Sequence, residues 1–194
     1  MGRPKAFDRT EALAKAMQLF WTQGYAATTT DELRAAMGIG RQSLYDTFGD
    51  KRQLFLAAFA HYNETSGATF ADTCIGSASA IAGIRAMLMQ VAEQRPADRA
   101  RGCLFVNTVA ELADRDPEIG GIVRAVTEAG VAHFAAAVDR AKAAREIPAT
   151  IDARTAGRFL FSSLSGLRLA GKSGTPPAAL RGVVEMTLAA IGVR

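Results

Sequence analysis

Residues 29–51 read TTDELRAAMGIGRQSLYDTFGDK, and this stretch says most about the architecture of the chain. Thr29 and Glu32 have the spacing of an N-terminal capping box, and Gly38 is a typical helix stop. We therefore predict two short helices joined by a glycine turn, which is the geometry of a helix-turn-helix motif. The expected bounds are 31–37 for the first helix, 38–40 for the turn and 41–48 for the second helix.

The rest of the chain also has helical periodicity, and no segment alternates with period two over a useful length. Asp116 followed by Pro117 is a strong helix start. We predict an all-α protein of about nine helices, with an N-terminal three-helix helix-turn-helix domain over 1–50 and a larger helical domain over 51–194. The other helices are expected over 8–24, 50–74, 81–95, 101–114, 116–145, 152–169 and 178–191, with Pro96 as a breaker.

The chain has 194 residues, of which 49% are hydrophobic, so its core needs no disulfide or metal. The formal net charge of +4 is divided equally between residues 1–60 and 61–194. Any nucleic-acid binding must therefore come from the placement of particular residues. We expect a cytoplasmic protein without a membrane partner, because no apolar run approaches the ~18 residues of a membrane span and no signal-peptide pattern is present.

The second helix of the motif carries polar side chains suited to DNA. Arginine can read guanine through two hydrogen bonds, and glutamine can read adenine in the same way. Hydroxyl and ammonium groups can bind phosphates, as can the start of the following helix. The candidates are Arg41, Gln42, Ser43, Tyr45, Thr47 and Lys51.

Residues 4–62 resemble the N-terminal domain of the TetR family of bacterial transcriptional regulators. The stretches that carry the resemblance are FWTQGY (20–25), TTTDEL (28–33), MGIG (37–40), SLYDTF (43–48) and Asp50-Lys51. The resemblance implies that Thr29 and Thr30 anchor a phosphate, that Arg41, Gln42 and Ser43 read bases, and that Tyr45 and Lys51 bind phosphates. It also implies a minor-groove arm formed by Arg3 and Lys5.

Two positions depart from the family pattern. Arg34 stands where a small residue is usual, so its side chain must point outward or towards DNA. Asp46 stands where an aromatic or basic residue is frequent, and it must accept from a cytosine amino group or pair with a neighbouring cation. These departures leave the operator sequence open, but not the mode of binding.

The resemblance implies that the C-terminal two-thirds bind a small molecule and form a homodimer. The helix expected over 152–169 is apolar nearly all round, so it must be buried on more than one side. We predict that it forms a four-helix dimer interface with the last helix, although a central helix of a monomeric bundle is the alternative. The predicted interface residues are Phe159, Leu160, Leu164, Leu167, Val184, Leu188 and Ile191.

A ligand pocket is expected between the helices over 101–114 and 116–145. Its candidate residues are Phe105, Asn107, Thr108, Glu111, His133 and Phe134, with the alternative that Phe105 and Phe134 are simply core residues. Cys103 is a further candidate, because residues 102–106 are similar to a segment of electrophile-responsive family members. A helix N-terminus and nearby cations lower a thiol pKa, whereas the alternative is a small buried side chain. The inducer is therefore expected to be apolar or electrophilic.

Other functions have weaker support. Residues 166–173 formally match the phosphate loop GxxxxGK[ST], but Gly174, Pro176 and Pro177 follow where that loop needs a helix. The pairs Cys74, Cys103 and His61, His133 lack zinc-ligand spacing, so we expect no metal, no cofactor and no enzymatic activity. We predict a homodimeric repressor that a small-molecule inducer releases from a palindromic DNA operator; the alternative is a helical ligand-binding or interaction bundle that has lost DNA binding.

Overall fold

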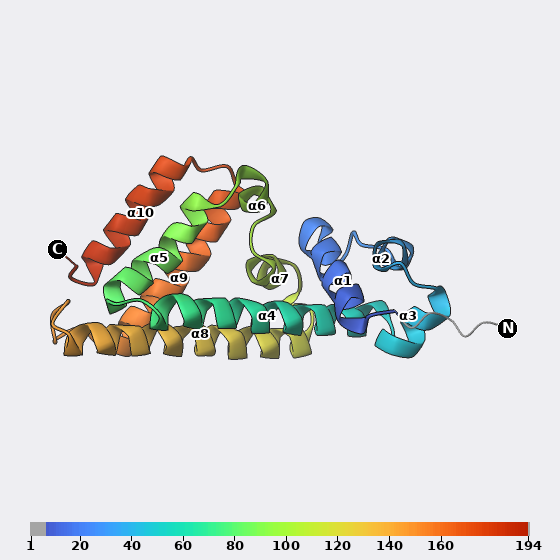
Figure 1. Ribbon diagram of the computed structural model, residues 1–194, viewed down its shortest axis with the longest axis horizontal. Helices are drawn as coiled ribbons and strands as arrows, with labels where there is room; N and C mark the ends of the chain where they lie inside the picture. Colours follow the sequence, from blue (N-terminus) through green and yellow to red (C-terminus); the bar gives the residue numbers. More distant parts are fainter. Residues whose placement is uncertain (1–6, 194) are drawn as a thin grey trace.

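The computed structural model describes residues 7–193, without the side chains of residues 71, 74 and 75. This part of the chain contains ten helices and no strand, in agreement with the predicted all-α class. A small head at one end is joined to a larger helical body by the long helix α4 (Figure 1). The helices are α1 (Arg9–Gln23), α2 (Thr30–Met37), α3 (Arg41–Phe48), α4 (Lys51–Ile75), α5 (Ala80–Glu93), α6 (Pro96–Arg101), α7 (Leu104–Leu112), α8 (Pro117–Ala143), α9 (Ala153–Lys172) and α10 (Pro177–Ala190).

The head folds because its caps and turns are encoded locally. Thr29 and Glu32 form the predicted capping box at the start of α2, and Asp50 and Gln53 form another at the start of α4. Gly38 has a φ of 70°, a left-handed conformation that glycine adopts without strain, and its N–H donates to the carbonyls of Arg34 and Ala35. The helix-turn-helix predicted from these residues is confirmed.

The head and the first half of α4 share one hydrophobic core. Phe20 from α1, Leu33 from α2, Leu44 from α3 and Phe55 from α4 are all essentially inaccessible to solvent. The core continues into the body through Phe105 of α7. The head is therefore packed against the body and is not a separate domain on a flexible linker.

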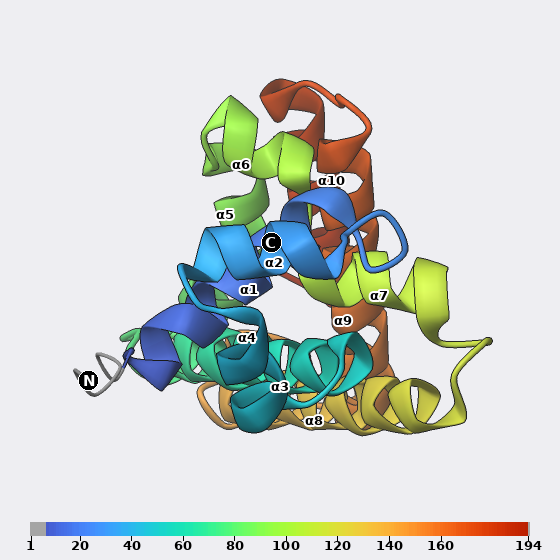
Figure 2. The same cartoon turned by 90° about the vertical axis from the view of Figure 1, so that its right-hand side faces the viewer.

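The body is a bundle in which α8 lies along α4 on one side and against α9 on the other (Figures 1 and 2). Close approach of α8 and α9 requires glycine at position 157, because a Cβ there would lie 2.6 Å from the carbonyl oxygen of Val131. A second core contains side chains from five helices of the described chain, including Ile84, Phe134, Leu160 and Val184.

Three details differ from the expectation. Pro96 does not simply break the chain but occupies the first turn of an additional helix, α6, because proline is favoured at that position. Cys103 is the residue before α7, so that helix starts three residues later than expected. Finally, α8 is long and apolar enough to cross a membrane by length and composition alone, although the core helix of a soluble protein passes the same test.

Candidate nucleic-acid interface and ligand cavities

The α3 helix presents a polar face to solvent at the tip of the head. Arg41, Gln42, Tyr45 and Asp46 are exposed, whereas Ser43 and Thr47 are half-buried. Leu44 and Phe48 alternate with them and are buried in the head core. Burial of this apolar side fixes α3 on the head, so that the predicted base-reading side chains point outward together.

Two contacts organise the exposed face of α3. The guanidinium of Arg41 lies 5.9 Å from the centre of the Tyr45 ring, within the range of a cation–π contact. Nε2 of Gln42 donates to Oδ1 of Asp46 at 2.7 Å. Within the described residues Asp46 therefore pairs with a neutral amide and not with the neighbouring cation that was one of its two expected partners.

The residues around α3 hold the remaining predicted phosphate contacts. The Thr29 hydroxyl is used for capping, where it binds the Glu32 carboxylate at 2.7 Å, and this hydrogen bond lowers the pKa of Glu32. Thr30, in the first turn of α2, is half-buried. Nζ of Lys51 lies 4.5 Å above the centre of the Tyr25 ring. Arg3 and Lys5 lie outside the described residues.

Arg34, which departs from the family pattern, forms an ion pair within its own helix. Its Nη1 lies 2.7 Å from Oδ1 of Asp31, and its side chain is one-third exposed. The side chain therefore points outward, as expected for a long cation at a helix crossing.

A clamp of three contacts ties the head to the segment that contains α7 and the start of α8. Nε1 of Trp21 donates to the carbonyl of Gly102 at 3.0 Å. The Glu111 carboxylate accepts from the backbone N–H groups of Tyr25 and Ala26 at 3.0 and 2.7 Å. Gly24, with a φ of 85°, turns the chain so that both N–H groups face this carboxylate.

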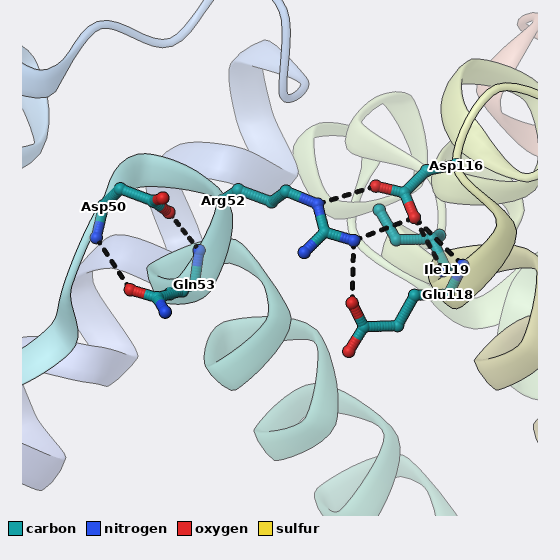
Figure 3. Close-up of polar contacts among 6 residues, drawn as sticks. All are labelled: Asp50, Arg52, Gln53, Asp116, Glu118 and Ile119. Carbon is teal, nitrogen blue, oxygen red and sulfur yellow. Dashed lines mark hydrogen bonds and ion pairs between the residues drawn. The ribbon is translucent and has the colours of Figure 1, made fainter.

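The third contact of the clamp joins α4 to α8 (Figure 3). Nε and Nη2 of Arg52 donate to the two oxygens of Asp116 at 2.8 and 2.9 Å, and Nη2 also donates to Glu118 at 2.7 Å. Asp116 caps α8 at the same time, through the backbone N–H groups of Glu118 and Ile119. The Arg52 hydrogen bonds, supported by these N–H groups, lower the pKa of Asp116 to about 2.

Two cavities lie in the body beneath the head. We call the first the polar cavity; it has a volume of about 180 Å³, and its walls include Trp21, Ser66, Gln90, Gln94, Gly102 and Cys103. We call the second the apolar cavity; it has a volume of about 330 Å³, and its walls include Phe70, Phe105, Val126, His133, Phe161 and Leu164. Tyr62, Ser66 and Arg168 line both cavities and so mark the junction between them.

Three of the residues predicted for a ligand pocket line these cavities. Phe105 and His133 lie in the wall of the apolar cavity, and the His133 ring stacks on Phe70 at 5.4 Å. Cys103 lies in the wall of the polar cavity, where its Sγ is 3.2 Å from the Tyr62 hydroxyl and 3.4 Å from Nη1 of Arg168. Burial raises the pKa of Tyr62 further above its usual value.

The other predicted pocket residues do not line either of these cavities, and their contact with a ligand stays a prediction. Phe134 is completely buried in the body core, and Thr108 is a buried residue of α7. Asn107 accepts from Nζ of Lys172 at 2.7 Å. Glu111 binds the end of α1 as described above. Asn107, Thr108 and Glu111 belong to α7, which contacts the head through Glu111 and the apolar cavity through Phe105.

The predicted dimer residues also need correction. Leu160, Leu164, Leu167, Val184, Leu188 and Ile191 are at most 3% exposed, because they form the body core within one protomer. Phe159 alone of the predicted set is exposed, at 41%. The exposed apolar side chains on the outer faces of α9 and α10 are Phe159, Leu169, Val183 and Met186. The expectation of a helix that is apolar nearly all round is wrong, because the buried side chains of α9 recur every three or four residues and form one stripe, at Ala156, Leu160, Leu164, Leu167 and Gly171.

Several residues that build the site were not predicted. Arg52, Trp21 and Tyr25 belong to the clamp, and Arg168 lies at the junction of the cavities. Arg168 falls within the formal phosphate-loop match, but this match lies largely within α9 and not in a loop. Among the described residues no cluster of His, Cys, Asp and Glu could hold a metal ion.

A helix-turn-helix head with an exposed polar helix, clamped to a helical body that encloses cavities, defines a class of DNA-binding regulators. Comparison with known proteins supports this class. Residues 12–58 match the family described as "Bacterial regulatory proteins, tetR family", and residues 80–186 match "Tetracyclin repressor-like, C-terminal domain". The chain belongs to the TetR family of transcriptional regulators, whose members are not enzymes.

Individual relatives agree with this assignment. The chain is 38% identical to YezE, an uncharacterized HTH-type transcriptional regulator of Bacillus subtilis (strain 168), over 61% of this chain and 62% of YezE. It is 29% identical to the HTH-type transcriptional repressor ComR of Escherichia coli (strain K12), over 96% of this chain and 90% of ComR. A solved structure of a cysteine mutant of the TetR family regulator CifR, complexed with 26-bp double-strand operator DNA, is 34% identical, with a TM-score of 0.82 over 98% of this chain and 100% of that chain.

Proposed function

We propose that this protein is a homodimeric transcriptional repressor that binds a palindromic DNA operator and is released from it by a small molecule. The observation that carries the proposal is the exposed face of α3, on which Arg41, Gln42 and Tyr45 are presented together. The dimensions of an α-helix match the DNA major groove, and two heads related by a two-fold axis would read two half-sites. The relatives ComR and CifR, a named repressor and a protein solved on operator DNA, support the proposal.

Dimerisation is supported by the apolar face of α9 and α10. Phe159, Leu169, Val183 and Met186 are 41%, 58%, 48% and 73% exposed, which is unusual for large apolar side chains on adjacent helices. A second copy of the same face would cover them and place two heads on one DNA duplex. We propose residues 1–50 as the DNA-binding domain, residues 51–194 as the ligand-binding and dimerisation domain, and the bacterial cytoplasm as the location.

Ligand response is supported by the position of the polar cavity. Trp21 and Gly102 line this cavity, and the hydrogen bond between the same two residues is part of the clamp. A molecule that enters the cavity therefore borders a contact between head and body. For the ligand to release DNA, it must bind more tightly to the arrangement of heads that does not fit the operator.

The electrophilic inducer stays a prediction that depends on Cys103. Its side chain is 3% exposed, so a reagent would reach Sγ only through the polar cavity. The intact mass after treatment with iodoacetamide, compared with that of Cys103→Ser, tests whether this thiol reacts in the folded protein.

The experiment that tests the proposed function is selection of random duplex DNA by the purified protein, followed by sequencing. Enrichment of an inverted repeat is the expected result and also supplies an operator for later assays. If folded protein enriches no sequence at low salt, the repressor proposal fails in favour of a helical bundle that has lost DNA binding.

A further inference from the structure

The two cavities share part of their walls, so a ligand in the apolar cavity can reach the polar side chains at the shared boundary. Tyr62, Ser66 and Arg168 contribute to the walls of each cavity. On one side of this boundary lie the amides of Gln90 and Gln94, and on the other lie rings such as Phe70 and Phe161. The junction therefore separates a hydrogen-bonding compartment from a larger apolar one.

Arg168 provides the charge of the polar compartment, since no other wall residue of the polar cavity is charged. Its described hydrogen bond runs to Sγ of Cys103 at 3.4 Å, and sulfur is a weak acceptor. In the described part of the chain no carboxylate oxygen lies within 4 Å of its guanidinium, in contrast to Arg52 or Arg158. A half-buried guanidinium without a counter-ion favours an anionic ligand, and its planar fork fits a carboxylate.

The apolar compartment fits a hydrocarbon or aromatic body. Its aromatic walls lie against Gly130, where a Cβ would be only 2.3 Å from the Phe161 ring. Glycine at this position therefore leaves room for Phe161 to stand at the edge of the cavity. Glu64 also borders the apolar cavity, and its carboxylate would repel an acid group placed on that side. The charges thus orient an acidic ligand with its head at Arg168.

We propose that the ligand is an amphipathic acid whose carboxylate binds Arg168 at the junction and whose apolar body fills the cavity between Phe70, Phe105 and Phe161. This inference rests on the proposed function only in calling the ligand an inducer. Binding of the acid itself is a property of the two cavities and can be measured without DNA.

The test is calorimetric titration of the full chain with matched series of straight-chain carboxylates, alcohols and ammonium ions of six, eight and ten carbons. We expect the carboxylate of the preferred length to bind about tenfold or more tightly than the alcohol, since charge-assisted hydrogen bonds exceed neutral ones. Arg168→Gln should remove this preference while leaving weak binding of the alcohol, and Arg168→Lys should keep part of the preference. Gly130→Ala should weaken binding of all three head groups, because Phe161 must then move into the cavity.

Equal binding of carboxylate and alcohol by the unmodified protein, or no binding across the series, would overturn the inference. An unchanged preference in Arg168→Gln would overturn it as well, and circular dichroism melts verify that each variant is folded. Operator binding is measured separately with the DNA obtained by selection. Protein that selects an operator but does not prefer acids contradicts only this inference, whereas protein that prefers acids but selects no DNA contradicts only the proposed function.

Discussion

The guanidinium of Arg52 holds both carboxylate oxygens of Asp116 at 2.8 and 2.9 Å, across 64 residues of sequence (Figure 3). Arg52 lies in the first turn of α4, which follows α3 directly, and Asp116 caps α8 in the body. One carboxylate therefore fixes the start of a body helix and the start of the helix that carries the head. If α8 moves relative to α4, either the ion pair breaks or the start of α4 moves together with α8.

Replacing Arg52 with glutamine should change the titration of Asp116. The pKa of Asp116 is lowered to about 2 from its usual 3.8, so the pair stabilises the fold above pH about 4 and this contribution is lost as the pH falls towards 2. In Arg52→Gln we expect the pKa to return towards its usual value, since the remaining backbone N–H groups are weaker partners. Carboxyl ¹³C NMR titration measures it, with Asp152 as an internal reference whose environment is unchanged. An Asp116 pKa that is the same in both proteins contradicts the proposed strength of the pair.

Replacing Glu111 with glutamine should loosen the turn after α1. The carboxylate accepts from both Tyr25 and Ala26, whereas an amide presents one acceptor oxygen and a donor NH₂ group. We expect hydrogen exchange at these two amides to accelerate by about tenfold, which corresponds to the loss of a charge-assisted hydrogen bond. Glu93→Gln, at an exposed position of α5, is the matched control. If the Tyr25 and Ala26 amides exchange at the original rate, the proposed role of Glu111 in the clamp is contradicted.

Replacing Arg41 with alanine should lower affinity for the selected operator by about 1–3 kcal/mol and relax preference at one base pair. The reason is that arginine reads guanine through two hydrogen bonds that alanine cannot form. Fluorescence anisotropy with labelled operator measures the change. Arg95→Ala removes the same formal charge at a side chain that is 84% exposed on the body, and it should leave affinity nearly unchanged. Equal losses in the two variants would remove Arg41 from the base-reading set.

Replacing Asp46 with alanine should alter the base preference of the protein. Asp46 now accepts from Nε2 of Gln42, which restrains the amide that would otherwise read adenine. The substitution frees Gln42 and removes a negative charge near the phosphates, so we expect a changed consensus and binding several-fold tighter, on the order of 1 kcal/mol. Repeating the DNA selection with the variant checks both effects. An identical consensus at identical affinity would show that Asp46 does not act on recognition.

Introducing a charge on the outer face of α10 should separate the protomers. Met186 is 73% exposed, so Met186→Glu should fold normally but place a carboxylate in the proposed interface. Sedimentation velocity should then report the 20.5 kDa protomer in place of a species of twice that mass. Ala136→Glu on the exposed side of α8 serves as the control. A Met186→Glu protein that remains dimeric would place the interface elsewhere.

Nearly all of the structure of the head could be predicted from the sequence. Its caps and turn involve residues within four positions of one another, such as Thr29 with Glu32 and Gly38 with Arg34, so their chemistry is visible in the order of the residues. The alternation of Leu44 and Phe48 with Arg41 and Tyr45 also showed which side of α3 faces outward, because the helix is short and amphipathic.

The body depended on contacts that no local pattern encodes. Glu111 is a polar residue of the kind expected in a ligand pocket, yet its carboxylate accepts from the backbone of Ala26, 85 residues earlier in the chain. The stripe of α9 that contains Leu160 and Leu164 is buried within the protomer, whereas Phe159 and Leu169 are exposed, so the packing of the body decides which apolar side chains are left for a partner. Burial of one face depends on what the neighbouring helices present to it. Local hydrogen bonding therefore set the recognition head, whereas long-range packing set the clamp, the two cavities and the surface left free for a second copy.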